Sequence, residues 1–154
     1  RRLEAGDREG AWARTVETLS ALGADLDAAG AVLCPEALPP PEADFLTTQA
    51  EAMALVEAVG HPRIRPMLDV KSMCSEAEGP AVLCARYGGS VVHVHANDAN
   101  RRGPGFGETD FRAIAAALRQ SGYDGVVSVE VFDYTPDPAT IARESLRCLK
   151  ESFR

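Results

Sequence analysis

The sequence predicts an α/β fold in which short parallel strands alternate with helices. Four short apolar runs are separated by segments with helical periodicity, most of them about ten residues or longer, a pattern typical of parallel βαβ units with right-handed crossovers. A carboxylate or an imidazole ends each run. The 154 residues are 45% hydrophobic and 25% charged, a composition that suits one globular domain.

Helices are predicted where apolar residues recur at helical spacing between boundary residues. Gly60 is expected to end the second helix, Thr109 or Asp110 to cap the fourth, and Asp137-Pro138 to open the last as cap and first-turn proline. The predicted helices cover residues 12–26, 48–59, 76–87 (interrupted early by Gly79-Pro80), 110–120 and the segment that follows 137.

Strands are predicted at residues 31–36, 64–69, 90–95 and 126–130, which gives the element order α-(βα)4. Such a chain could form an open doubly wound sheet or part of a closed (β/α)8 barrel. A full barrel takes ~250 residues. Four βα units therefore correspond to one half of a barrel.

One metal-competent side chain ends each predicted strand: Glu36, Asp69, His95 and Glu130. The carboxyl ends of parallel strands meet at one edge of the sheet, where α/β folds carry their chemistry. Three carboxylates and one imidazole gathered there would repel one another unless a cation lies among them. This oxygen-rich donor set predicts one divalent ion, Mn²⁺ first, with Mg²⁺ or Co²⁺ as alternatives.

The period-two alternation of a strand places His93 on the same face as His95, and Val94 on the face that meets the helices. His93 could orient a metal ligand or be a hydrogen-bonded core histidine. We favour the second interpretation.

Three stretches resemble the xylose-isomerase-like TIM barrels: VVHVHANDANR at 91–101, GPGFG at 103–107 and GYDGVVSVE at 122–130. Within these barrels, the sequence is most similar to the sugar isomerase/epimerases that include D-tagatose and D-psicose 3-epimerases. The resemblance covers essentially the whole chain but only strands five to eight of the family's barrel. It implies that residues 1–154 form a single, truncated domain, the C-terminal half of a (β/α)8 TIM barrel.

The resemblance also implies roles for individual residues. The family binds one divalent metal through residues that match the four strand-end side chains above. Glu36 and Glu130 would also be the acid/base pair, one removing a proton beside the ketose carbonyl and the other returning a proton to the opposite face of the enediolate. Glu42 and Arg101 match residues that contact the substrate.

Two segments depart from the family's pattern. After Glu36, residues 39–41 are three prolines where the family has Asn, Arg and an aromatic residue, so the loop is stiffer and less polar. Ser72 stands where the epimerases carry a substrate-touching His, which puts 3-epimerisation of a free ketose in question. Lys71 could bind a phosphate or carboxylate of the substrate, and we count Lys71 and Ser72 among the substrate-binding candidates.

The net charge of −7 argues against nucleic acid or an anionic membrane as a partner. Only three histidines are present, too few for the multi-zinc centre of the endonuclease branch of this superfamily. None of the four cysteines lies in a CxxC pair, which suits a reducing, cytoplasmic location. Four βα units leave two open sheet edges, so we expect a piece of a longer chain or a homo-oligomer that completes a barrel.

The function that we expect is a metal-dependent sugar isomerase or epimerase acting on a small-molecule sugar through an enediolate. Two alternatives remain. A keto-inositol-type dehydratase would use the same metal site and expel a hydroxyl group, and a catalytically inactive sugar-binding barrel would bind metal without turnover.

Overall fold

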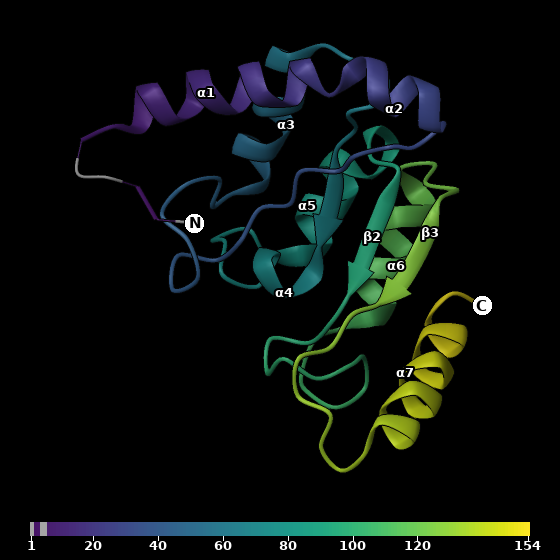
Figure 1. Cartoon of the computed structure of the whole chain (residues 1–154). Coiled ribbons are helices and arrows are strands. Elements are labelled where there is room, and N and C mark those ends of the chain that lie inside the picture. The colour runs from purple at the N-terminus through teal and green to yellow at the C-terminus, as the bar shows by residue number, and fades with distance from the viewer. Residues whose placement is uncertain (1, 4–5) are drawn as a thin grey trace. The chain divides into compact units, whose positions relative to one another are not determined.

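The computed structural model describes residues 2–3 and 6–154 and divides into two compact units, 1–67 and 68–154. Figure 1 shows the elements in order along the chain. They are α1 (Arg8–Ala21), α2 (Gly23–Ala29), α3 (Gln49–Val59), β1 (Met67–Asp69), α4 (Val70–Met73), α5 (Gly79–Tyr87), the 3-10 turn η1 (Gly88–Ser90), β2 (His93–Ala96), α6 (Phe111–Gln120), β3 (Val126–Val129) and α7 (Pro138–Ser152).

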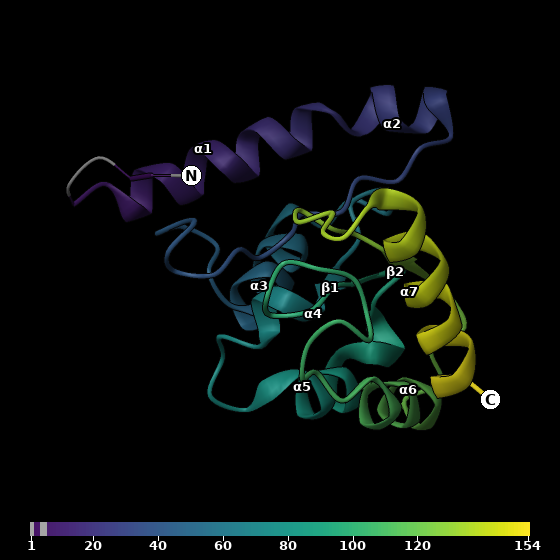
Figure 2. The same cartoon turned by 90° about the horizontal axis from the view of Figure 1, so that it is seen from below.

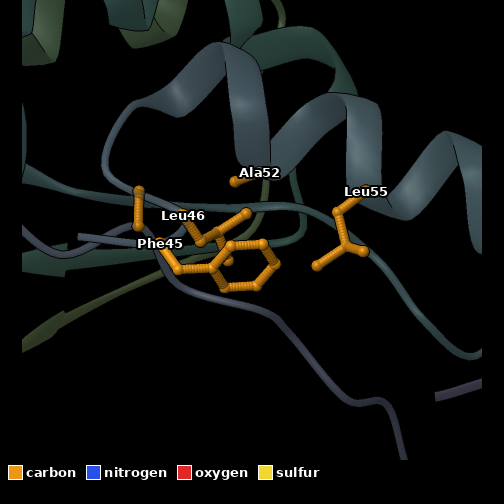
Figure 3. Packing of buried hydrophobic residues seen from close by; sticks show 5 residues of the cluster. Phe45, Leu46, Ala52 and Leu55 are labelled. Atoms are coloured by element: carbon orange, nitrogen blue, oxygen red, sulfur yellow. The ribbon is translucent and has the colours of Figure 1, made fainter. Parts of the chain in front are cut away.

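The first unit has its own hydrophobic core between α1 and α3. Phe45 and Leu46, from the segment before α3, face Ala52 and Leu55 of that helix (Figure 3). From α1, the Trp12 ring meets the Phe45 ring edge-on at 6.3 Å between centroids. The predicted helix 48–59 is confirmed within one residue.

Both ends of α3 show why that helix was predictable. The Thr48 hydroxyl accepts a hydrogen bond from the Glu51 N–H at 3.2 Å, as a helix cap should. At the other end Gly60 adopts φ 64°, the left-handed conformation that closes a helix.

The predicted helix 12–26 is wrong as a single element, because the chain breaks at Leu22 between α1 and α2. Gly23 follows the break and is buried against the His61 ring, where an added Cβ would lie 2.6 Å from the imidazole Nε2. The glycine is thus required by a close approach that helical periodicity does not reveal.

The predicted strand 31–36 is also wrong. Among the described residues, it forms a single parallel bridge between Leu33 and Ile64. The Leu33 N–H donates to the Arg63 carbonyl at 2.9 Å, and the Arg65 N–H donates to the Leu33 carbonyl at 3.0 Å. Pro35 has no N–H with which to extend this pairing.

In the second unit, the sheet has the order β1-β2-β3, and β2 pairs with β3 in parallel with His95 opposite Ser128. Helix α6 packs between α5 and α7 (Figure 2). The predicted strand 64–69 shortens to β1, which starts directly after Pro66. The described residues thus hold three of the four predicted strands, an α/β fragment with a parallel sheet.

The predicted alternation holds in β2. Val94 and Ala96 are buried at 0% and 1% exposure. The rings of His93 and His95 meet edge-on with centroids 5.1 Å apart, so they share the opposite face of the strand.

The two helices that follow β2 and β3 were also predicted. The predicted helix 110–120 is confirmed as α6, and the last predicted helix is confirmed as α7. Asp110 and Asp137 cap these helices, as predicted.

Among the described residues, no helix combines the length and the apolar character needed to cross a lipid bilayer.

Candidate metal centre

The second unit brings three of the predicted metal ligands together. Asp69 ends β1, His95 lies in β2, and Glu130 directly follows β3. The His95 Nδ1 atom is 3.8 Å from Asp69 Oδ2 and 3.4 Å from Glu130 Oε2. One donor atom from each residue lies within 4.8 Å of the others, a spacing that a single ion could bridge.

Asp69 is held rigidly at both carboxylate oxygens. Its side chain is 1% exposed. Oδ1 accepts a hydrogen bond from the Ser72 N–H at 2.7 Å and thereby caps α4, and Oδ2 accepts one from the Asn97 side-chain amide at 2.7 Å. The short helix α4 was not predicted from the sequence, and it exists where this strand-end carboxylate caps it.

Asn97 is a site residue that sequence reasoning missed. It is fully buried and directly follows β2. Its Nδ2 also donates to Glu130 Oε2 at 3.2 Å, and its Oδ1 accepts from the Lys71 N–H at 2.7 Å. The available signal was a polar residue at a strand end, two positions after His95, the predicted histidine ligand.

His93 lies next to the cluster. Its Nε2 atom is 2.8 Å from the Ser128 hydroxyl. The hydrogen bond that the favoured interpretation of His93 needs is therefore present. Burial, and secondarily the neighbouring His95, lower the pKa of His93. The neutral imidazole is therefore favoured at position 93.

Lys71 and Arg101, two substrate-binding candidates, both approach the ring of Phe132. Lys71 Nζ is 4.8 Å from the ring centroid and Arg101 Cζ is 5.4 Å from it. Phe132 is 47% exposed, and sequence reasoning missed it. The third candidate in this unit, Ser72, is 2% exposed, and its hydroxyl has no hydrogen-bond partner in the described part of the chain.

The loop that carries Arg101 is tied to the loop after β3. The Arg101 carbonyl accepts hydrogen bonds from the Phe132 and Asp133 N–H groups at 2.9 and 3.0 Å. Arg102 Nε adds an ion pair with Asp133 Oδ2 at 3.0 Å. Hydrogen bonds from Thr135, and secondarily from Arg102, lower the pKa of Asp133 to about 2, so this pair stays charged at neutral pH.

Glu36 and Glu42 belong to the first unit. Glu36 is half-buried and follows Pro35, and Glu42 is exposed in the proline-rich turn, where its N–H donates to the Pro39 carbonyl at 2.8 Å. The assignment of Glu36 as fourth ligand and of Glu42 as substrate contact stays a prediction.

Curated relatives of this chain are sugar 3-epimerases. The chain is 36% identical over 126 residues to a D-psicose 3-epimerase of Agrobacterium fabrum, an alignment that covers 82% of this chain and 44% of the relative. It is 32% identical over 130 residues to an L-ribulose 3-epimerase of Mesorhizobium japonicum, covering 84% and 43%. The chain thus spans less than half the length of these relatives.

Solved structures agree with this relationship. A crystal structure of D-psicose 3-epimerase determined in the presence of D-fructose superposes with a TM-score of 0.84 at 28% identity, covering 97% of this chain and 57% of that one. The family model described as xylose isomerase-like TIM barrel matches residues 2–152. The chain therefore belongs to the xylose isomerase-like TIM-barrel family.

Proposed function

We propose that this protein is a divalent-metal-dependent sugar isomerase or epimerase that moves a proton on a ketose through an enediolate. The observation that carries the proposal is the convergence of Asp69, His95 and Glu130 at adjacent strand ends. Membership of a family whose matched relatives are sugar 3-epimerases supports it. Glu36 is proposed as the fourth ligand.

The donor set fits a divalent ion. Two carboxylates and one imidazole lie close together, and Asp69 is almost completely shielded from water. Like charges in such surroundings are compatible only when a cation or a proton neutralises them. Oxygen donors with one nitrogen suit Mn²⁺, Mg²⁺ or Co²⁺. When bound, the ion would polarise the substrate carbonyl and stabilise negative charge on its oxygen.

Glu36 and Glu130 are proposed as the acid/base pair. One glutamate removes the proton from the carbon beside the ketose carbonyl, and the other returns a proton to the opposite face, which inverts that carbon. Proton transfer of this kind needs a carboxylate held within hydrogen-bonding reach of the reacting carbon. The hydrogen bond from Asn97 restrains the Glu130 carboxylate, which supports this proposed role.

Lys71, Ser72, Arg101 and Glu42 are proposed to contact the substrate. Lys71 and Arg101 place two cations at the exposed ring of Phe132, two residues after Glu130. Ammonium and guanidinium groups bind sugar oxygens, and they bind phosphate or carboxylate more strongly. A ketose with an anionic group is therefore the substrate class to compare with free D-psicose and L-ribulose.

The test is proton exchange in deuterated water. The protein is stripped with a chelator, reloaded with Mn²⁺, Mg²⁺ or Co²⁺, and incubated with free and phosphorylated ketoses while the products are followed by NMR. We expect metal-dependent deuterium incorporation at the carbon beside the carbonyl, together with the epimer or isomer. Absence of exchange with every ketose would contradict the proposal.

Two outcomes would select the alternatives. Loss of water, detected by mass, would indicate a keto-inositol-type dehydratase, and metal binding without any turnover would indicate an inactive sugar-binding barrel. The variant Glu130→Gln should lower the exchange rate about 10²- to 10⁴-fold. Glu108→Gln, a change at an exposed loop glutamate, is the matched control and should leave the rate unchanged.

A further inference from the structure

We infer that Asn97 is a positioning residue that holds the carboxylates of Asp69 and Glu130 in the geometry that binds the metal. The inference rests on the proposed metal site and adds a residue to it. Asn97 itself contacts neither the substrate nor the reacting atoms in this scheme. It acts through the two carboxylates.

Both N–H donors and the carbonyl oxygen of the Asn97 amide have a hydrogen-bond partner. A primary amide offers two N–H donors and one carbonyl acceptor. The Nδ2 atom donates to Asp69 Oδ2 at 2.7 Å and to Glu130 Oε2 at 3.2 Å, and Oδ1 accepts from the Lys71 N–H at 2.7 Å. At 0% exposure, water does not compete for these positions. The amide orientation is therefore fixed by three partners.

The oxygens that Asn97 binds are the same oxygens that face His95. Asp69 Oδ2 and Glu130 Oε2 lie 3.8 and 3.4 Å from His95 Nδ1. One amide group thus sets the positions of both carboxylate donors relative to the imidazole. Loss of the amide would remove the restraint that Asp69 Oδ2 and Glu130 Oε2 share, and these donors would have to be ordered when the ion binds.

An amide is also the appropriate chemical group at this position. Two carboxylates drawn close together repel each other, and the positive N–H end of the Asn97 dipole faces both of them. A carboxylate at 97 would add a third negative charge and replace donors with acceptors. An apolar residue would leave the two oxygens with fewer hydrogen bonds in a buried site.

The hydrogen bond from the Lys71 N–H also joins Asn97 to helix α4. Through Asn97 Oδ1, the end of β2 is joined to the start of α4, whose first turn also holds Asp69 by the Ser72 N–H. One side chain therefore connects the ends of three neighbouring strands. Groups that orient metal ligands in this way commonly contribute 10- to 100-fold to metal affinity.

The test compares metal affinity in Asn97→Ala and in a matched control. Asn100→Ala removes an exposed asparagine of the same loop, whose amide bonds the backbone groups of Phe106 and Arg102 at 2.8 and 3.0 Å. Mn²⁺ is titrated into each protein by calorimetry. We expect the Kd to rise about 10- to 100-fold in Asn97→Ala and to stay within about twofold of wild type in Asn100→Ala.

A double-mutant cycle separates positioning from simple stability. If Asn97 acts through Glu130, Asn97→Ala should weaken Mn²⁺ binding less in a Glu130→Ala background than in wild type. Equal Kd values for wild type and Asn97→Ala, with only the metal-free Tm lowered, would overturn the inference. Should Asn97→Ala fail to fold, Asn97→Ser takes its place with the same expected direction. A wild type that binds no Mn²⁺ would instead refute the proposed function.

Discussion

Arg101 combines an unfavourable backbone conformation with a candidate substrate-binding side chain. Its φ of 71° lies in the left-handed region, which a residue with a Cβ adopts at a cost of about 1–2 kcal/mol. The conformation is maintained because the Arg101 carbonyl accepts two N–H groups from the loop after β3. Strain that the surroundings hold in place is characteristic of functional sites.

Strain and binding at Arg101 can be separated by two substitutions. Arg101→Gly and Arg101→Ala both remove the guanidinium group from Phe132, so both should raise KM for the ketose to a similar extent. Only glycine relieves the left-handed backbone. Arg101→Gly should therefore be more stable than Arg101→Ala by about 1 kcal/mol in urea denaturation, and equal midpoints for the two variants would argue against stored strain.

The buried thiol of Cys84 predicts that stability falls at alkaline pH. It is 0% exposed, and burial raises the pKa of its thiol to about 12 from 9.0. Between these two values the unfolded chain releases a proton that the folded chain retains. The free energy of unfolding should then decrease with pH by up to about 1.4 kcal/mol per unit.

The measurement is urea unfolding at several values between pH 8.5 and 10.5, compared with Cys84→Ala. The alanine variant is less stable throughout because it leaves a cavity, but its stability should decline less steeply with pH. Parallel pH dependences for the two proteins would show that the Cys84 thiol has no such effect.

Residues whose positions depend on strand periodicity could be predicted from the sequence. Asp69, His95 and Glu130 each end a strand or lie near its end, and parallel strands bring their carboxyl ends together. Asn97 and Phe132 could not be assigned in the same way. Their roles depend on which atoms they meet across strands, and one sequence does not specify those contacts.

At the scale of elements, boundaries were predictable where local chemistry determines them. Asp110 caps α6, and Asp137 with Pro138 opens α7. Gly60 ends α3. The predicted strands 31–36 and 64–69 were too long because Pro35 and Pro66 remove backbone donors that a longer ladder needs. The division between α1 and α2 depends on the packing of Gly23 against His61, a contact distant in sequence.

The cap of α6 provides a test at this scale. Asp110 Oδ1 accepts hydrogen bonds from the Arg112 and Ala113 N–H groups, both at 3.1 Å. Asp110→Ala should lower the free energy of unfolding by about 1 kcal/mol, whereas Asp110→Asn should retain most of the stability because asparagine caps about as well. Urea midpoints of the two variants measure the difference, and an Asn variant as unstable as the Ala variant would refute the capping role.

At the scale of the whole molecule, the four predicted metal ligands are divided between the two compact units of the chain. The second unit holds Asp69, His95 and Glu130, and the first holds Glu36. Val126, at the start of β3, is 63% exposed. The chain also spans less than half the length of its curated relatives.

Hydrogen exchange with and without Mn²⁺ tests whether both units bind the ion. At a metal concentration of 100 times Kd, bound metal stabilises the state that binds it by about 2.7 kcal/mol. The exchange rate of amides that exchange only when that unit opens should therefore fall about 100-fold. We expect this slowing in β1, β2 and β3, because the proposed ligands of the second unit lie in these strands or directly after them. If Glu36 is the fourth ligand, the Leu33 and Leu38 amides, which are hydrogen-bonded in the first unit, slow as well.

Glu36→Gln then serves as the discriminating variant. It should abolish the slowing at Leu33 and Leu38, because the first unit no longer supplies a charged donor. The second unit should retain a reduced, metal-dependent protection from its own three ligands. If metal slows hydrogen exchange in the wild type only in the second unit, Glu36 is excluded as a ligand. Of the two glutamates proposed as the acid/base pair, Glu130 alone would then combine metal binding with proton transfer.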